Sequence, residues 1–408
     1  MGPTEALVKY ICESRFEDVP GDVIEKAKWI VLDTLGCALA GSQTELGRVV
    51  IDQVNELGGK KESLIFGKKM RTNSLCAGYC NTILSDALDF EETAPLAHPS
   101  AVIIPAALAS GEMAKAPGKT LLLAVIAGYE VSLRIGYAIL PSPEVQQMVA
   151  VAFSFLSFGA CTASGKILNL TFEQMLNAFG YAGAATSLPT WATKWKRPLH
   201  WVKNNYGEQT QAGMLGALLS RKGFLGPPKI LDEDFGFWRM VGSDRWDDKV
   251  ITEGLGVLYE IRKDTFKPYP ACRWLHATLD ALNFIVTEQG FTARDVEWVK
   301  VRTVKGAVNL LDYNPETMID GEFSLPYCCA MILMRQKPGP SWYSVENLSS
   351  KEVASCMAKV KAEVDPDIVE SGWKDPKISA IVRVHLRDGK EKFPTKRRGG
   401  RLRGSYFP

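Results

Sequence analysis

The sequence Asp264-Thr265-Phe266-Lys267-Pro268-Tyr269-Pro270 separates two parts of the chain that differ in the spacing of their apolar residues. Its two prolines exclude regular helix, because proline lacks a backbone N–H and clashes with the preceding turn. Before this segment the apolar residues recur at helical spacing, and after it they also alternate along short runs. We therefore predict a mainly α protein, with a large all-helical domain over residues 1–260, a smaller α+β lid domain over 261–394 and a basic tail over 395–408.

Helical periodicity dominates the part before the prolines. Residues 22–41 place most of their apolar side chains on one face, with Pro20 before them and Gly41 as a stop signal. Further helices are predicted over 73–89, 101–115, 120–140, 145–167, 172–185 and 208–222. After the prolines we predict a helix over 273–289 and two strands over 296–304 and 378–386, where apolar and charged residues alternate.

Composition indicates a soluble globular protein and argues for neither a nucleic-acid nor a membrane partner. The chain has 408 residues, of which 46% are hydrophobic and 23% charged, and its formal net charge is +2. Its nine scattered cysteines include no C-x-x-C pair, which is typical of free thiols in a reducing cytoplasm. The charge-free run 145–165 is rich in Ser and Gly, so we expect a packed helix there rather than a membrane span. Charges at Glu5 and Lys9 argue against a signal peptide.

One stretch, from Leu88 to Ser100, concentrates groups that handle protons. It contains three acids, a hydroxyl and one of only four histidines: Asp89, Glu91, Glu92, Thr93 and His98. This density suits general acid–base chemistry on a small substrate, and a helix that opens near Ser100 points free N–H groups toward an anion. The residues alone fit equally well a polar loop that caps the helix, with Ser100 as N-cap and Asp89 in solvent.

Three further segments place cations or hydroxyls next to turns. The first is a cationic cluster suited to a carboxylate-rich substrate, although a surface loop is the alternative: Lys194, Lys196, Arg197 and His200. The second surrounds a rigid turn and the start of a helix: Lys267, Arg273 and His276. Within it, Cys272 fits a buried thiol better than a nucleophile. The third, residues 320–327, sets Ser324 and Tyr327 before a helix.

Motifs for metal, nucleotide and hydrolase chemistry are missing from the sequence. Cys76 and Cys80 have no third ligand nearby, although a zinc or iron–sulfur site requires three or four. The sequence also lacks G-x-x-x-x-G-K-[ST], a G-x-G-x-x-G that follows a strand, and G-x-S-x-G. We therefore expect acid–base chemistry with no cofactor and no metal.

Five segments together resemble the MmgE/PrpD family, which contains 2-methylcitrate dehydratases, cis-aconitate decarboxylases and an iminodisuccinate epimerase. These segments are residues 18–36, 89–99, 128–136, 266–276 and 323–327, and the resemblance extends from residue 4 to residue 394. It implies a helical domain with a smaller α+β lid domain, a homodimer and no metal. It also implies a substrate with two or three carboxylates that reacts at a carbon next to a carboxylate.

The resemblance further implies residue roles in the Leu88–Ser100 stretch. Asp89, Thr93 and His98 match the family's Asp-Phe-Asp-Asp-Thr run and the His-Pro that follows it. Glu91 and Glu92 replace the two following aspartates, with an effect that the sequence leaves open. We expect His98 to be the principal acid or base and Asp89 to set its orientation and protonation state.

The later segments complete this expected site. The family's active-site lysine falls on Lys196, with Lys194 as the alternative, and a second proton carrier falls on His276. The remaining residues are expected to bind the carboxylates of the substrate: Arg197, Lys267, Arg273 and Tyr327.

Departures from the family pattern shape the functional hypothesis. A histidine of the decarboxylases is replaced at Val149 or Ala150, their tyrosine near Val308 is missing, and the chain diverges from the family near Pro394. We therefore predict a cofactor-independent lyase of the 2-methylcitrate dehydratase type. The alternatives are a cis-aconitate-type decarboxylase or iminodisuccinate-type epimerase at the same site, or a degenerate member that binds carboxylates without turnover.

Overall fold

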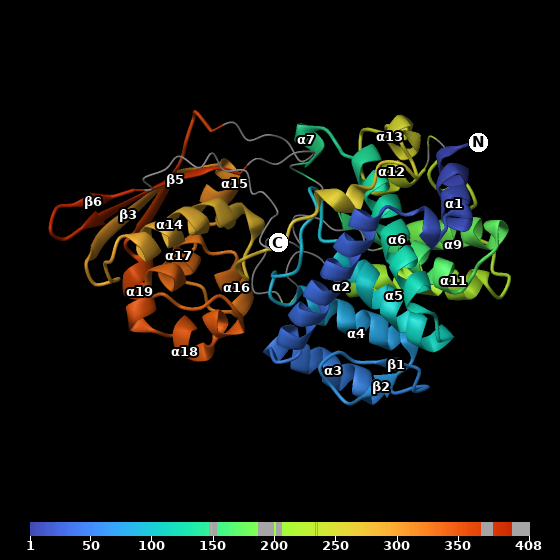
Figure 1. Cartoon of the computed structure of the whole chain (residues 1–408), viewed down its shortest axis with the longest axis horizontal. Helices are drawn as coiled ribbons and strands as arrows, with labels where there is room; N and C mark the ends of the chain where they lie inside the picture. The colour runs from blue at the N-terminus through green and yellow to red at the C-terminus, as the bar shows by residue number, and fades with distance from the viewer. Residues whose placement is uncertain are drawn as a thin grey trace. The chain divides into compact units, whose positions relative to one another are not determined.

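The computed structural model describes residues 1–146, 148, 153–186, 200, 206–232, 234, 236–368 and 378–393. These residues fold as two compact units (Figure 1). The first unit takes most of the chain up to Asp264, and the second takes the described residues from Thr265 onward together with Leu88–Phe90 and His200. Sequence analysis placed this division near residue 260, and it did not anticipate that Leu88–Phe90 would join the second unit.

The first unit is almost entirely helical, as expected. Its one sheet is the short antiparallel pair β1 (Ser63–Leu64) and β2 (Arg71–Thr72) among the residues described. Its helices include α1 (Pro3–Glu13), α2 (Gly21–Gly41), α3 (Glu45–Leu57), α4 (Ser74–Asp86), α5 (Ser100–Ala114), α6 (Gly118–Ala138), α7 (Pro143–Gln146), α8 (Leu156–Ile167), α9 (Phe172–Ala184), α11 (Tyr206–Ser220), α12 (Phe237–Met240) and α13 (Asp248–Thr252).

Most of these helices match the predicted ones, with differences of a few residues at their ends. The helix predicted over 145–167 is confirmed in its second half as α8, which begins at Leu156. In its first half the short α7 ends at Gln146, and residues 147 and 149–152 lie outside the described residues. The helices α1 and α3 and the β1–β2 pair were not predicted.

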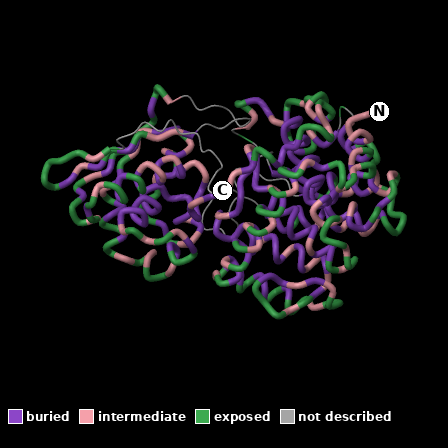
Figure 2. Tube along the Cα trace, viewed as in Figure 1, coloured by how far each residue is buried: buried purple, intermediate pink, exposed green. Residues whose placement is uncertain are grey.

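The centre of this unit is formed by α5, α6, α8 and α11, which pack against one another and consist mostly of buried residues. Figure 2 colours buried residues purple along the chain. Small residues allow these helices to approach closely. A Cβ atom on Gly213 of α11 would lie 2.5 Å from the backbone nitrogen of Cys161 in α8. The close approach explains why Gly and Ala recur along the interior helices.

Helix α6 is the one helix in the described residues that is long and apolar enough to cross a membrane by length and composition. It is a core helix of the first unit, because 89% of its apolar window is buried there. It also carries a buried ion pair, in which Arg134 Nε lies 2.5 Å from Glu130 Oε1. The guanidinium donates further bonds of 2.7–3.1 Å to the carbonyls of Val250, Ile251 and Glu253.

The second unit is a four-stranded sheet covered by helices. The strand order is β4 (Val360–Val364), β3 (Val296–Thr303), β5 (Ala380–Leu386) and β6 (Glu391–Lys392). β3 pairs with β4 in parallel and with β5 antiparallel, so that Val299 lies opposite both Val360 and Val384. The strands predicted over 296–304 and 378–386 are thus confirmed as β3 and β5, whereas β4 and β6 were not predicted.

The helices of this unit begin with a 3₁₀ turn over Arg273–Leu275 that continues directly into α14 (His276–Glu288). The sequence predicted one helix over 273–289, which is correct apart from this tighter first turn. α14 packs on β5 and on α17 (Leu325–Leu333). The other helices are α15 (Lys305–Val308), α16 (Met318–Glu322), α18 (Val345–Leu348) and α19 (Lys351–Met357).

Candidate active site

The loop between α4 and α5 holds the proton-handling stretch. Asp89 adopts φ +44°, a left-handed conformation that Asp and Asn tolerate better than most residues. The side chains of this loop are buried: Asp89, Glu91 and Glu92 are 0% exposed, and His98 is 5% exposed. The alternative of a loop with a solvated Asp89 is therefore wrong.

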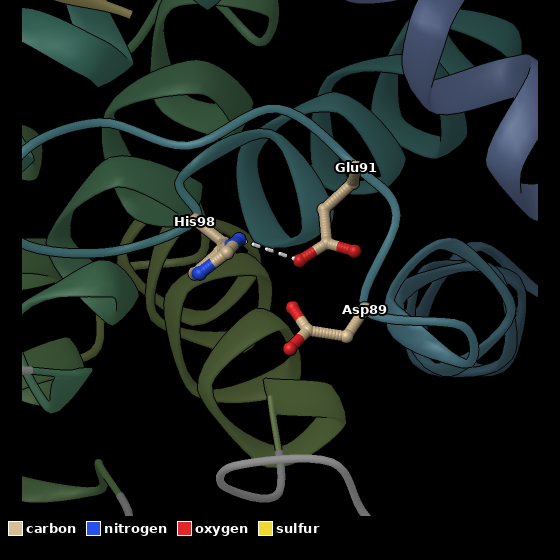
Figure 3. Close-up of side chains that lie close together, drawn as sticks. All are labelled: Asp89, Glu91 and His98. Carbon is tan, nitrogen blue, oxygen red and sulfur yellow. Dashed lines mark ion pairs between the residues drawn. The ribbon is translucent and has the colours of Figure 1, made fainter. Parts of the chain in front are cut away.

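His98 is held by two acceptors on its Nδ1 atom. This nitrogen lies 2.7 Å from Oε1 of Glu91 and 3.0 Å from the backbone oxygen of Glu92 (Figure 3). A carbonyl oxygen only accepts hydrogen bonds, so Nδ1 carries the proton in this arrangement. In the neutral ring Nε2 is then the basic nitrogen, and the adjacent carboxylate stabilises the imidazolium that forms when Nε2 takes a proton.

Asp89 has a different partner, Lys267, and both residues belong to the second unit. The Lys267 ammonium forms an ion pair with the Asp89 carboxylate and donates to the Asp89 backbone oxygen at 2.5 Å. Their side chains are 0% and 1% exposed, so the pair is almost completely removed from water. We expected Asp89 to orient His98, but the carboxylate on Nδ1 of His98 is that of Glu91.

Asp89, Glu91 and His98 are the described residues that could hold a metal ion. Their candidate ligand atoms all lie within 4.8 Å of one another, and Figure 3 shows the three side chains turned toward a common space. Two of these groups already have charged or hydrogen-bonding partners, because Lys267 neutralises Asp89 and Glu91 accepts from His98. The donor set, as it is paired, suits proton transfer better than cation binding.

His276 opens α14 in the second unit and is buried. Its Nε2 lies 3.0 Å from the backbone oxygen of Ala271, which fixes Nε2 as the protonated nitrogen. Burial, and then the charge of Lys267, lower the pKa of His276 to about 4. The lowered pKa favours the neutral ring, and the role of His276 as a second proton carrier stays a prediction.

The other predicted site residues have separate placements. Thr93 is buried, with its hydroxyl donating to the backbone oxygen of Ala94 at 3.1 Å. Arg273 lies half-buried in the 3₁₀ turn that precedes α14. Tyr327 is fully buried, and its hydroxyl donates to the Trp342 backbone oxygen, so its expected contact with the substrate stays a prediction. Four predicted or alternative positions lie outside the described residues: Lys194, Lys196, Arg197 and the Val149–Ala150 position.

The start of α5 is also different from the expectation. Pro99 is its N-cap and Ser100 its first residue, so the prediction of Ser100 as N-cap is wrong. The expected anion at this helix end is supplied by the protein, because the backbone N–H of Ser100 donates to Oε1 of Glu92 at 2.8 Å. Pro99 lacks an N–H and a capping hydroxyl, so this carboxylate satisfies a donor that no N-cap side chain reaches.

Glu91 and Glu92 are the residues whose importance sequence reasoning missed. Both were set aside as replacements of aspartates, yet Glu91 pairs with His98 and Glu92 caps α5. The available signal was their surroundings, because two acids between the apolar helices predicted over 73–89 and 101–115 need partners once they are buried.

The chain thus combines a helical unit and an α+β unit with a buried Glu91–His98 pair and a buried Asp89–Lys267 pair. The chain belongs to the MmgE/PrpD family. The family's N-terminal domain matches residues 5–248, and its C-terminal domain matches residues 269–397.

Curated relatives agree with this assignment. The chain is 23% identical to cis-aconitate decarboxylase of Aspergillus terreus over 413 residues, covering 95% of this chain and 83% of the relative. It is 26% identical to cis-aconitate decarboxylase of Homo sapiens, covering 90% of this chain and 78% of the relative. The Mus musculus enzyme of the same name is 25% identical over 89% of this chain and 76% of its own length. These relatives are lyases, and the chain is an enzyme of their family.

Proposed function

We propose that the protein is a cofactor-independent lyase that eliminates water from a hydroxy di- or tricarboxylate, as 2-methylcitrate dehydratases do. The observation that carries this proposal is the buried Glu91–His98 pair, with Nδ1 of His98 2.7 Å from the Glu91 carboxylate. The pair leaves Nε2 as a base whose conjugate acid is stabilised. A group of this kind contributes a rate factor of about 10²–10⁴ in proton transfer.

In this mechanism His98 Nε2 removes the proton α to a carboxylate of the substrate. The C–H electron pair forms the new double bond, the β C–O bond breaks, and the hydroxyl leaves as water after it takes a proton from an acid. Lys267 and Arg273 are the described cations that we assign to the substrate carboxylates, together with Lys196 and Arg197. Cations at a carboxylate stabilise the negative charge that develops in the transition state.

Decarboxylation is the second candidate, because the curated relatives described above are cis-aconitate decarboxylases. In that reaction the C–C bond to a carboxylate breaks, carbon dioxide leaves, and the imidazolium of His98 protonates the resulting carbanion. Epimerisation shares the proton abstraction and returns the proton to the opposite face.

We further propose that the protein acts as a homodimer in the cytoplasm.

The decisive experiment incubates purified protein with a panel that includes 2-methylcitrate, citrate and cis-aconitate, and follows the products by NMR. Loss of water supports the dehydratase, released carbon dioxide supports the decarboxylase, and inverted configuration without elimination supports the epimerase. We expect His98→Ala to reduce turnover by about 10²–10⁴-fold. His385→Ala is the matched control, because His385 stacks on Trp298 of β3 at 4.9 Å, far along the chain from the loop. Thermal stabilisation by a panel member without any turnover would contradict the proposal and favour a carboxylate-binding protein.

Dialysis against EDTA tests whether the reaction is independent of metal. Because Lys267 neutralises Asp89 and Glu91 accepts from His98, we expect kcat to be unchanged after chelation. Loss of activity that returns on addition of a divalent cation would instead assign Asp89, Glu91 and His98 to a metal site.

A further inference from the structure

One face of the sheet in the second unit carries exposed cations. The other face is the buried one, where α14 packs on β5 and α17 packs on β4 and every second residue of β3 and β5 is buried. The residues that alternate with these point away from the core. Among them Lys300 of β3, Lys361 of β4 and Arg383 of β5 are exposed. This face is therefore a charged surface rather than a packing surface.

The register of the strands places these three cations in one row. Lys300 lies opposite Lys361 in the parallel β3–β4 pair and opposite Arg383 in the antiparallel β3–β5 pair. Neighbouring strands are about 4.8 Å apart, so the row covers about 10 Å. Neither the Lys361 nor the Arg383 side chain has an ion-pair partner among the described residues. Because like charges directly opposite each other destabilise a sheet, an anion bound at this row would stabilise it.

Acids close to the row offset only part of its charge. Oε1 of Glu363 in β4 lies 3.0 Å from Nζ of Lys300 and 3.9 Å from Nε of Arg302 in β3. Nη2 of Arg302 also lies 3.0 Å from Oδ1 of Asp365, whose side chain is 1% exposed. This buried carboxylate holds the guanidinium in place at the end of the row, so that one of the cations is already oriented before a ligand binds.

A hollow of about 230 Å³ opens beside the row. Its lining combines three cations, an acid and apolar side chains: Lys300, Arg302, Arg383, Glu363, Ile381 and Pro366. The cations outnumber the acid, so the hollow attracts anions. Arginine binds a carboxylate through two parallel hydrogen bonds, and lysine binds it as a point charge. The apolar side chains offer contacts to a carbon skeleton between the carboxylates.

We propose that this hollow and the adjoining Lys361 form a binding site for a small aliphatic polycarboxylate. Carboxylates spaced along a carbon chain match cations spaced across three strands, whereas a phosphate concentrates its charge at one point. The ligand's carboxylates bind Arg383, Lys300 and Lys361, and its carbon skeleton contacts Ile381. The site lies wholly within the second unit and involves no covalent step. It is separate from the Leu88–Ser100 loop and does not depend on the reaction proposed above.

Calorimetric titration with propane-1,2,3-tricarboxylate tests the proposal, because this probe has no hydroxyl group to eliminate. We expect Arg383→Gln to bind one probe molecule fewer than the wild type, since the lost charge-assisted hydrogen bonds weaken the site about 10–100-fold. Lys337→Gln is the matched control, because it removes the same charge from an exposed position in the loop after α17. Probe bound in the candidate active site is counted in all three proteins, so a difference of one belongs to the sheet.

Thermal unfolding without the probe gives a second readout, of opposite sign. At low ionic strength we expect Arg383→Gln and Lys361→Gln to raise Tm by about 1–3 °C, because each substitution relieves repulsion within the row. Lys337→Gln should leave Tm unchanged. Glu363→Gln should tighten probe binding about 2–5-fold, because it removes a like charge from the lining of the hollow.

Equal numbers of bound probe molecules in the wild type and Arg383→Gln would overturn the site. So would an equal rise in wild-type Tm with the probe and with sodium chloride at the same ionic strength, because screening alone would then explain it. Inorganic phosphate that binds as tightly as the probe would overturn the assignment to a polycarboxylate. If Arg383→Gln does not fold, Lys361→Gln is titrated in its place. If the variant loses the site while the wild type turns over no panel substrate, the sheet site stands and the proposed function fails.

Discussion

The ion pair between Asp89 and Lys267 gives the clearest prediction for a single residue. Lys267→Met leaves the Asp89 carboxylate buried without its cation, which costs about 3–5 kcal/mol of unfolding free energy. Adding Asp89→Asn should recover part of this loss, because Asn removes the charge and tolerates the φ of +44° that Asp89 adopts. Urea unfolding of the single and double variants measures both effects.

Lys300→Met is the control for this prediction. Lys300 pairs with Glu363 at 3.0 Å, but both side chains are about half exposed, so the pair contributes at most about 1 kcal/mol. Equal losses for Lys267→Met and Lys300→Met would show that the buried pair is no stronger than a surface pair.

At this scale the sequence could identify the residue types of the candidate site but not their partners. Asp89, His98 and Lys267 were singled out as candidate site residues, and all three side chains are buried. Which acid faces His98 depends on the left-handed turn at Asp89, after which Glu91 contacts the ring. The sequence of residues 89–92 contains no signal for that turn.

For the helices, the closest packing of α11 on α8 gives a prediction about glycine. A Cβ on Gly213 would lie 2.6 Å from the Cβ of Ala160 and would also clash with the backbone oxygen of Ser157. Gly213→Ala should therefore destabilise the fold by about 1–3 kcal/mol through overpacking. Thermal or urea unfolding measures the loss.

Gly36→Ala on α2 should have the opposite sign. A Cβ there meets no atom within 4 Å, and removing backbone freedom inside a helix stabilises by about 0.5–1 kcal/mol. If both substitutions stabilise the fold, helix propensity rather than packing decides the effect at Gly213.

The elements differ in how well the sequence predicts them, for physical reasons. Helices with one apolar face, such as α2, and strands with alternating burial, such as β3, follow directly from residue spacing. β4 was missed because only Val360 is buried along this edge strand, which leaves no alternation to detect. α8 starts late because a run of small and apolar residues does not mark where a helix begins.

For the whole molecule, we predict a homodimer. Leu32 and Leu39 lie on the outer side of α2 and are 59% and 52% exposed, which is apolar surface of the kind that association buries. Light scattering should give a mass twice the 44.9 kDa of the chain. A monomer at micromolar concentration would contradict the prediction, and Leu32→Glu should lower the mass only if this side of α2 takes part.

The contacts made by α6 restrict where the chain can accept insertions and deletions. Three side chains of this one helix bind other segments of the first unit. Tyr129 donates to Glu92, and Glu130 accepts from the backbone N–H of Glu260. Arg134 donates to the carbonyls of Val250, Ile251 and Glu253. Inserting or deleting one residue ahead of Tyr129 within α6 would rotate all three side chains by about 100° around the helix axis. All of these anchors would then be lost together, so homologous chains should tolerate insertions in the loops that flank α6 and exclude them from its first three turns.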